Sequence, residues 1–219
     1  MTITVADLAG VVYSAGKVFD GLRTGRLDTA NFLRSGSTHG INSRADLALL
    51  EDLRDAVMEV LGHDGDIDAD FVCAVNSQIS RSGPLHPGQL RTADQAIGVQ
   101  TRYGRHTPTA LDQAGLTAII ESALVTGDDV DAALNLFVDI AKAQPFEDGN
   151  KRTALLVANR HLIAADTGLL LTIPVDDTNP ALADEFNDLL AQAYLDRNPD
   201  AVKELLRDQG LLEISDAAE

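Results

Sequence analysis

The sequence predicts a mostly helical, all-α fold that carries one small β-hairpin. Three observations support this prediction. Apolar residues recur at helical spacing along most of the chain, and N-cap residues, glycines and prolines mark where the helical segments begin and end. Residues 85–108 are the exception, because this weakly periodic stretch holds two short extended pieces, 97–99 and 103–105. We expect these two pieces to form the hairpin.

The balance of charge limits the partners of this chain. Its 219 residues include 17 basic and 34 acidic side chains, a formal charge of −17 that repels nucleic acid and anionic membranes. The N-terminus lacks a basic segment followed by an apolar run, and no stretch reaches the roughly 20 apolar residues that span a bilayer. We therefore expect a cytoplasmic protein that binds neither nucleic acid nor membrane. The single Cys73 lies in an apolar pattern and predicts a buried, inert thiol.

The N-terminal part of the chain predicts helices separated by polar turns. A first helix spans residues 5–23, and a shorter helical segment, 28–34, leads into a polar turn at 35–40. Ser43 and Asp46 have the spacing of a capping box, which predicts the start of a long helix that continues to Gly62.

The rest of the chain follows the same rules. The acidic turn 64–70 has the alternating aspartates of a calcium loop but lacks the terminal glutamate of an EF-hand. We interpret it as the start of a helix that runs through Ile79. The other expected elements are a helix over 109–125, a buried connection over 168–174, two helices that begin at Asn179-Pro180 and Asn198-Pro199, and a free tail over 215–219.

Residues 144–153 change abruptly from loop chemistry to an amphipathic helix. Pro145 interrupts the preceding helix, and Gly149 permits a backbone geometry that is closed to other residues. Lys151 and Arg152 fall in the first turn of the next helix. Cations in a first turn oppose the helix dipole, and unpaired N–H groups also gather there, so the two residues lower stability unless an anion sits between them. The sequence therefore predicts a local phosphate site.

This stretch resembles the signature of the Fic/Doc (fido) proteins. That signature runs histidine, any residue, Phe, any residue, Asp or Glu, Gly or Ala, Asn, Gly or Lys, Arg, and six of its seven specified positions match residues 144–152. The ending Lys151-Arg152-Thr153-Ala154-Leu155 looks more like the Doc branch. The resemblance implies the fido fold as a single domain over 1–219, with N-terminal helices in 1–62, a core with a hairpin flap and the signature loop in 63–175, and C-terminal helices in 176–219.

Members of this family mostly transfer AMP from ATP to a protein hydroxyl, and Doc-type members transfer phosphate. The resemblance implies ATP or another nucleotide and Mg²⁺ as cofactors, with Asp148 on the metal. It implies that Gly149, Asn150 and Lys151 present N–H groups and side chains to the phosphates. Arg152 would neutralise charge in the transition state. The structural alternatives are a helix cap for Asp148 and a surface ion pair for Arg152.

Gln144 occupies the position of the family's catalytic histidine, which removes the proton from the target hydroxyl. Glutamine has no nitrogen that titrates near neutral pH, and losing a general base costs about 10²–10⁴-fold in rate. His86, His106 or Glu147 could supply a substitute base.

Two functions follow from this departure. One is a weakened Fic-type protein adenylyltransferase or Doc-type phosphotransferase, and the other is a catalytically inactive fido domain that regulates by binding a nucleotide or a protein. A plain helical interaction module is a third interpretation, but it leaves the cations at the helix start without a reason.

Ser35, His39 and Gly40 resemble a degenerate form of the family's inhibitory motif, which runs Ser or Thr, three residues, Glu, then Gly or Asn. His39 stands in place of the glutamate, and Leu155 in place of the second arginine with which that glutamate pairs. The alternative is a simple polar turn.

The resemblance also implies a protein partner. Family members align a target strand along the flap, here residues 85–108, so we expect a target protein to dock there by β-augmentation. The Doc-like ending adds the expectation of a toxin–antitoxin-like pairing.

Overall fold

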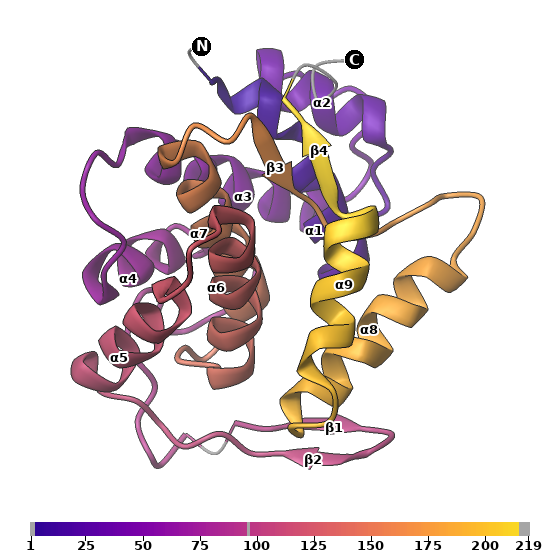
Figure 1. The fold of residues 1–219 in the computed structure, drawn as a ribbon. Coiled ribbons are helices and arrows are strands. Elements are labelled where there is room, and N and C mark those ends of the chain that lie inside the picture. The colour runs from indigo at the N-terminus through magenta and orange to yellow at the C-terminus, as the bar shows by residue number, and fades with distance from the viewer. Residues whose placement is uncertain (1–2, 96, 215–219) are drawn as a thin grey trace.

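The structure, a computed structural model, describes residues 3–95 and 97–214 (Figure 1). It confirms the predicted class, since short antiparallel strand pairs accompany a mostly helical chain. The helices of this part are the 3-10 helix η1 (Val5–Leu8), α1 (Ala9–Asp20), α2 (Arg26–Ser35), α3 (Arg44–Gly62), α4 (Ala69–Ser77), α5 (Gln113–Leu124), α6 (Asp129–Ala143), α7 (Asn150–Ala164), α8 (Ala181–Tyr194) and α9 (Pro199–Gln209). The strands are β1 (Val99–Thr101), β2 (Gly104–His106), β3 (Leu169–Leu171) and β4 (Leu211–Glu213).

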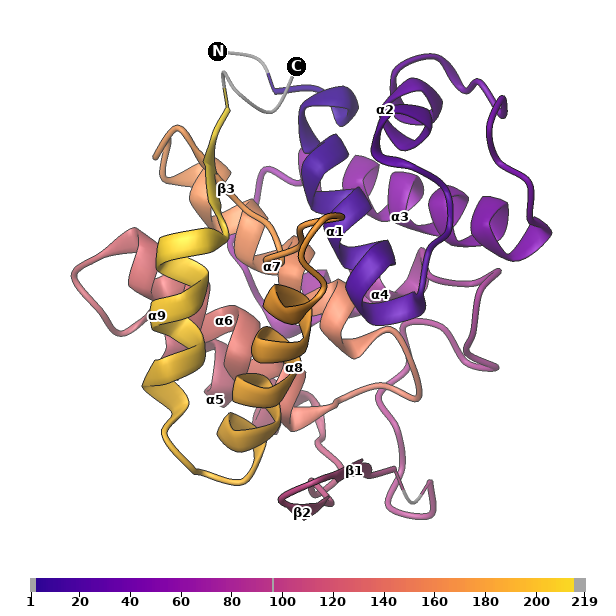
Figure 2. The same cartoon turned by 90° about the vertical axis from the view of Figure 1, so that its right-hand side faces the viewer.

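Helix α7 lies at the centre of the molecule. It packs most extensively against α6 and also contacts α1, α3, α4 and β3 (Figures 1 and 2). Eight consecutive residues from Arg152 to Asn159 are buried, so the helix is enclosed on all sides and lacks the single inward face that its sequence suggests. The N-terminus of this enclosed helix is therefore held by neighbours on several sides.

The predicted first helix, 5–23, is divided in two. The 3-10 helix η1 precedes α1, which ends at Asp20 because Gly21 adopts a left-handed conformation with φ 67°. Helix α2 covers the expected short segment and ends at Gly36, which is also left-handed.

The capping box predicted at Ser43 is half correct. The Ser43 hydroxyl accepts hydrogen bonds from the amides of Ala45 (3.2 Å) and Asp46 (3.3 Å), as expected of an N-cap. The Asp46 carboxylate does not reach back to Ser43. It accepts instead from the Thr24 amide at 2.9 Å, and so fixes the link between α1 and α2.

The acidic turn does begin a helix. Asp68 caps α4 by accepting from the Phe71 amide at 2.8 Å, and the helix ends at Ser77, before the expected Ile79. Cys73 is half-buried rather than fully buried, and burial raises the pKa of its thiol. An unreactive thiol is consistent with this environment.

The predicted hairpin is present, displaced by one or two residues. Strands β1 and β2 pair with Val99 opposite His106, at the lower edge of Figure 1. The tip of the hairpin is fastened to α8. The Tyr103 hydroxyl donates to Asp188 at 2.6 Å, and Arg102 forms an ion pair with the same carboxylate. The flap therefore spans the space between α6 and α8.

The C-terminal region differs from the sequence prediction in two respects. The expected buried connection contains β3, which pairs with β4 across about 40 residues of chain. Pro180 caps α8 and Ala181 begins it, one residue later than predicted, while Pro199 is the first residue of α9, as expected. The predicted tail, 215–219, lies outside the described residues. In residues 3–95 and 97–214, no helix combines the length and the hydropathy needed to cross a membrane.

Candidate functional site

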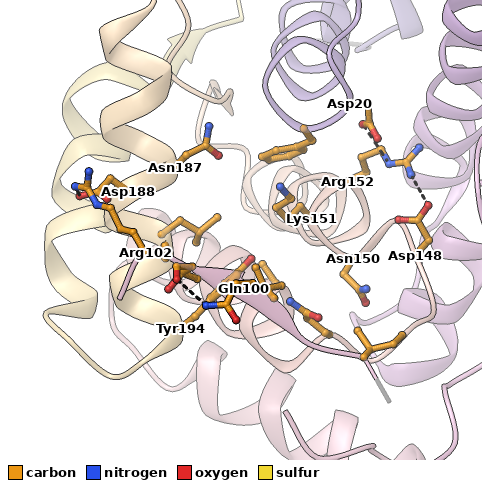
Figure 3. A pocket seen from close by; sticks show the side chains of 18 of the residues that line it. Asp20, Gln100, Arg102, Asp148, Asn150, Lys151, Arg152, Asn187, Asp188 and Tyr194 are labelled. Atoms are coloured by element: carbon orange, nitrogen blue, oxygen red, sulfur yellow. Dashed lines mark hydrogen bonds and ion pairs between the residues drawn. The ribbon is translucent and has the colours of Figure 1, made fainter. Parts of the chain in front are cut away.

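A cavity of about 700 Å³ opens at the N-terminus of α7 (Figure 3). Its walls come from the end of α1, the loop before α7, strand β1 and helix α8. This volume lies within the range that binds cofactor-sized ligands. The polar residues of the lining are Asp20, Gln100, Thr101, Arg102, Gln144, Glu147, Asp148, Asn150, Lys151, Arg152, Asp184, Asn187, Asp188 and Tyr194.

Gln144 ends α6 in a left-handed conformation, with φ 45° and ψ 60°. The buried Arg91 holds it there, because the Arg91 Nε donates to the Gln144 carbonyl at 2.7 Å and the Arg91 amide donates to the Pro145 carbonyl at 2.9 Å. Gln144 lines the cavity, and its side-chain amide makes no hydrogen bond with any described residue. Residue 144 is thus at the cavity wall, and its glutamine side chain cannot act as a general base.

Asn150 and Phe146 fasten the loop to itself. The Phe146 amide donates to Asn150 Oδ1 at 2.8 Å, and Asn150 Nδ2 donates to the Phe146 carbonyl at 3.0 Å. The Phe146 ring is fully buried, as expected of an anchor. These two bonds fix the Asn150 side chain to the loop and use one of its two side-chain N–H donors.

Gly149 adopts φ 76°, the left-handed geometry that the sequence predicts at this position. A Cβ here would lie 2.9 Å from Ile79 Cδ1 and 3.1 Å from Asn76 Nδ2, so these side chains would have to shift to admit it. Asn76 Nδ2 itself donates to the Asp148 carbonyl at 3.0 Å. Both conformation and space therefore favour glycine.

Gly149→Ala should lower the free energy of unfolding by about 1–3 kcal/mol, because it adds left-handed strain to a crowded contact. Chemical denaturation measures this loss. Gly62→Ala is the matched control, since nothing lies within 4 Å of a Cβ there and its φ is not positive. Equal stability of the two variants would contradict the crowding described for Gly149.

Arg152 is buried, with 3% of its side chain exposed, and is not a surface ion pair. Its Nη1 donates to the Ser82 hydroxyl at 2.8 Å, its Nη2 lies 3.5 Å from Asp148 Oδ2, and its Nε lies 3.5 Å from Asp20 Oδ2. Figure 3 shows the guanidinium between the two carboxylates. The 3.5 Å separations are long for charge-assisted bonds, so the ion pairs are loose.

Lys151 points into the space between α7 and α8, and its Nζ lies 4.6 Å from the Phe19 ring centroid (Figure 3). Burial lowers the pKa of this ammonium and raises the pKa of the nearby Asp20 carboxyl. Both charges are thus costly where they are. An anion that entered the cavity would stabilise Lys151 as an ammonium.

Asp148 does not cap α7. Its Oδ1 accepts from the adjacent Gly149 amide at 2.7 Å, and the helix start has no side-chain cap. The amides of the first turn, Asn150 to Arg152, have no partner within the helix by geometry. They form an anion-binding surface next to the cavity.

The donors at this site suit Mg²⁺ bound together with phosphates. In residues 3–95 and 97–214, no cluster of three or more His, Cys, Asp and Glu side chains could hold a metal. Asp148, however, has a half-exposed side chain at the cavity wall. Mg²⁺ commonly takes one or two carboxylates and completes its shell with substrate phosphates and water.

The three substitute bases differ in position. Glu147 lines the cavity, but its Oε2 accepts from the amides of Leu85 (3.0 Å) and His86 (3.2 Å). His86 and His106 are not part of the lining, and His106 Nε2 lies 2.7 Å from the Lys142 carbonyl. Of the three, only Glu147 lines the cavity, and its carboxylate already accepts two backbone hydrogen bonds.

Ser35, His39 and Gly40 lie away from the cavity. The Ser35 hydroxyl donates to the Asn31 carbonyl at 2.8 Å, His39 is exposed, and Gly40 lies beside Asp28. These contacts are those of the polar turn that links α2 to α3, and among residues 3–95 and 97–214 none of the hydrogen bonds of Ser35, His39 and Gly40 reaches residues 144–153.

The carboxylate that does reach Arg152 is Asp20, which sequence reasoning missed. A signal for it exists, because an acid in the last turn of a helix opposes the helix dipole in the same way as Lys151 and Arg152 do at a helix start. Ser82 and Asn76 were also missed. Nothing in the local sequence distinguishes these two polar side chains from surface residues.

Comparisons with known proteins bear on part of the sequence and on the fold. Residues 66–162 match the sequence model of the Fic/DOC family. A Fic domain containing signaling protein from Bacteroides thetaiotaomicron shares the fold with a TM-score of 0.67 and 15% identity, over 91% of this chain and 80% of that one. Fic-1 from C. elegans gives a TM-score of 0.69 and 19% identity, over 94% of this chain and 60% of that one. No curated protein matches the sequence. Residues 66–162, which include the loop between α6 and α7, thus match the Fic/DOC family model, and the chain shares the fold of solved Fic domain proteins.

Proposed function

We propose that this chain binds a nucleoside triphosphate, ATP in the first instance, with Mg²⁺ in the cavity at the start of α7. The observation that carries the proposal is a buried guanidinium, Arg152, beside an uncapped helix N-terminus at the wall of a cavity of about 700 Å³. The first-turn amides and Lys151 would hold the phosphates, and Arg152 would balance their charge. Asp148 would hold Mg²⁺, which neutralises phosphate charge when bound.

The chemistry we propose for this site is transfer of AMP or phosphate to a protein hydroxyl, at a low rate. Phosphoryl and nucleotidyl transfer depend mainly on positioning and charge stabilisation, and the residues named above supply both. The proton of the attacking hydroxyl needs an acceptor, and Gln144 cannot take it. Slow transfer is the expected consequence.

A catalytically inactive domain that regulates by binding is the second candidate. It is favoured by the carboxylate of Asp20, which pairs with the Arg152 guanidinium, together with the missing base. A protein partner would add a strand to the flap. Strand β1 pairs only with β2 in the described part of the chain, and Val99, Gln100 and Thr101 line the cavity. The unpaired edge of β1 supports the proposal of β-augmentation.

Transfer of label from ATP to the protein itself or to a cell lysate tests the two candidates. Label on the α-phosphate follows AMP, and label on the γ-phosphate follows phosphate. Incorporation catalysed by the native chain supports transfer and refutes the binding-only candidate. A chain that binds ATP without incorporating either label supports the regulator.

Asp20→Asn should tighten the binding of ATP with Mg²⁺ about tenfold, or about 1.4 kcal/mol, because it removes an anion that competes with phosphate for Arg152. Isothermal calorimetry measures the change. Asp184→Asn is the control, since Asp184 lines the same cavity without pairing with Arg152 in the described residues. An equal gain in both variants would indicate a general charge effect and contradict the competition.

The same prediction has a pH dependence. Burial raises the pKa of Asp20, so this carboxyl protonates earlier than an ordinary aspartate as the pH falls. Protonation releases Arg152 and leaves native Asp20 neutral like asparagine. The advantage of Asp20→Asn should therefore be largest above the Asp20 pKa and should disappear below it. ATP itself titrates in the same way in both measurements, so its protonation cancels when the affinity of Asp20→Asn is divided by that of the native chain.

A further inference from the structure

Asp52 of α3 has a fully buried carboxylate and does not line the cavity. It receives an unusual number of donors from the chain just after α4. Its Oδ1 accepts from the Arg81 amide and from Arg81 Nη1, both at 3.0 Å, and its Oδ2 accepts from the Ser82 amide at 2.8 Å and the Ser82 hydroxyl at 2.6 Å. A buried carboxylate at this density of bonds fixes the loop that carries its donors.

The Ser82 hydroxyl connects this carboxylate to the cavity. A carboxylate can only accept hydrogen bonds, so the single proton of the hydroxyl is directed to Asp52. The lone pairs of the same oxygen are then left for a donor, and Arg152 Nη1 donates to it at 2.8 Å. A guanidinium can only donate, so Asp52 does not set the direction of this bond but holds the Ser82 oxygen where it accepts from Arg152.

The same loop also backs onto Asp148. A Cβ placed on Gly83 would lie 2.1 Å from Asp148 Oδ2, so the loop backbone runs against that carboxylate. Further along, the Gly88 amide donates to Asn76 Oδ1 at 2.9 Å, and Asn76 bonds the Asp148 carbonyl. A shift of the loop would therefore move the groups that contact Arg152 and Asp148.

We propose that Asp52 is a positioning residue that holds Arg152 in its phosphate-binding orientation through Ser82. The role of Arg152 toward phosphate rests on the proposed function. The orientation of the guanidinium does not, and it can be measured without a ligand. Asp52 lies outside residues 66–162, so the orientation depends on a part of the chain that the family match does not cover.

The test compares four variants. Asp52→Asn and Ser82→Ala remove the connection, while Ser82→Thr keeps the hydroxyl. Asp55→Asn is the matched control, because Asp55 bonds Arg81 Nη2 at 2.8 Å but makes no bond to Ser82 in the described residues. Far-UV circular dichroism and thermal unfolding confirm which variants fold.

The first readout is the Nε–Hε signal of Arg152 in ¹⁵N NMR spectra of the ligand-free protein, identified by its absence in Arg152→Lys. We expect its hydrogen exchange to accelerate about tenfold or more in Asp52→Asn and Ser82→Ala. Ser82→Ala loses the hydroxyl that accepts from the guanidinium, and Asp52→Asn loses the carboxylate that holds this hydroxyl in place. Exchange should stay at the native rate in Ser82→Thr and Asp55→Asn. A merely structural role would lower the unfolding temperature without this pattern.

The second readout is affinity for ATP with Mg²⁺. We expect it to fall about tenfold in Asp52→Asn and Ser82→Ala and to remain in the other two variants. A native exchange rate in folded Ser82→Ala would overturn the proposal, even if Asp52→Asn fails to fold. The expected exchange pattern in a chain that binds no ATP would support the positioning role and refute the proposed function instead.

Discussion

Gln144→His is expected to raise the rate of AMP or phosphate transfer to a protein hydroxyl by about 10²–10⁴-fold, the usual contribution of a positioned general base. The backbone at residue 144 is left-handed, and histidine tolerates that conformation better than most residues do. Arg91 holds the flanking carbonyls and would keep the imidazole directed at the cavity. The initial rate of label incorporation from ATP measures the gain.

The control for this gain is Gln144→Asn, which changes the same side chain without adding a group that titrates near neutral pH. It should leave the rate at the native level. If Gln144→His binds ATP as tightly as the native chain and transfers no faster, residue 144 is not the position from which a base acts, and the proposed chemistry is wrong.

Arg152→Ala is expected to weaken the binding of ATP with Mg²⁺ by about 100-fold or more. The guanidinium would make at least two charge-assisted bonds to phosphate, each contributing about 1.5–3 kcal/mol. The variant also leaves Asp20 and Asp148 without their shared cation, which adds repulsion toward the anionic ligand. Isothermal calorimetry on the folded variant gives the affinity.

Arg105→Ala is the matched control for the loss of a positive charge, because Arg105 is exposed on β2 and does not line the cavity. Its affinity for ATP should be close to native. Unchanged affinity in Arg152→Ala would refute the assignment of phosphate to the start of α7.

Much of the fold could be predicted from local sequence. Proline and glycine at 145 and 149 predict the break between α6 and α7, and the structure has left-handed backbone at both ends of that break. The paired strands β3 and β4 could not be predicted, because each has only three residues and its partner is distant in sequence. The enclosure of α7 was also hidden, since apolar spacing on one face does not reveal how many neighbours a helix has.

The candidate site, too, could be predicted only in part from local sequence. The cations at the start of α7 are visible in the sequence as an electrostatic conflict, but their partners come from elsewhere in the chain. Asp20 and Ser82 reach Arg152 through tertiary packing alone. Asn150 had been expected to face phosphate with its side chain, and the structure instead uses that amide to fasten Phe146. Spacing identifies which residues gather, whereas packing decides which of their atoms remain free.

The most direct test of the central claim is a crystal structure of the chain with ATP and Mg²⁺. We predict phosphates over the first-turn amides of α7, a phosphate oxygen bonded to the Arg152 guanidinium in place of Asp20, and Mg²⁺ on Asp148. An empty cavity at saturating ATP, or a nucleotide bound elsewhere while Arg152 keeps its contact with Asp20, would contradict the assignment.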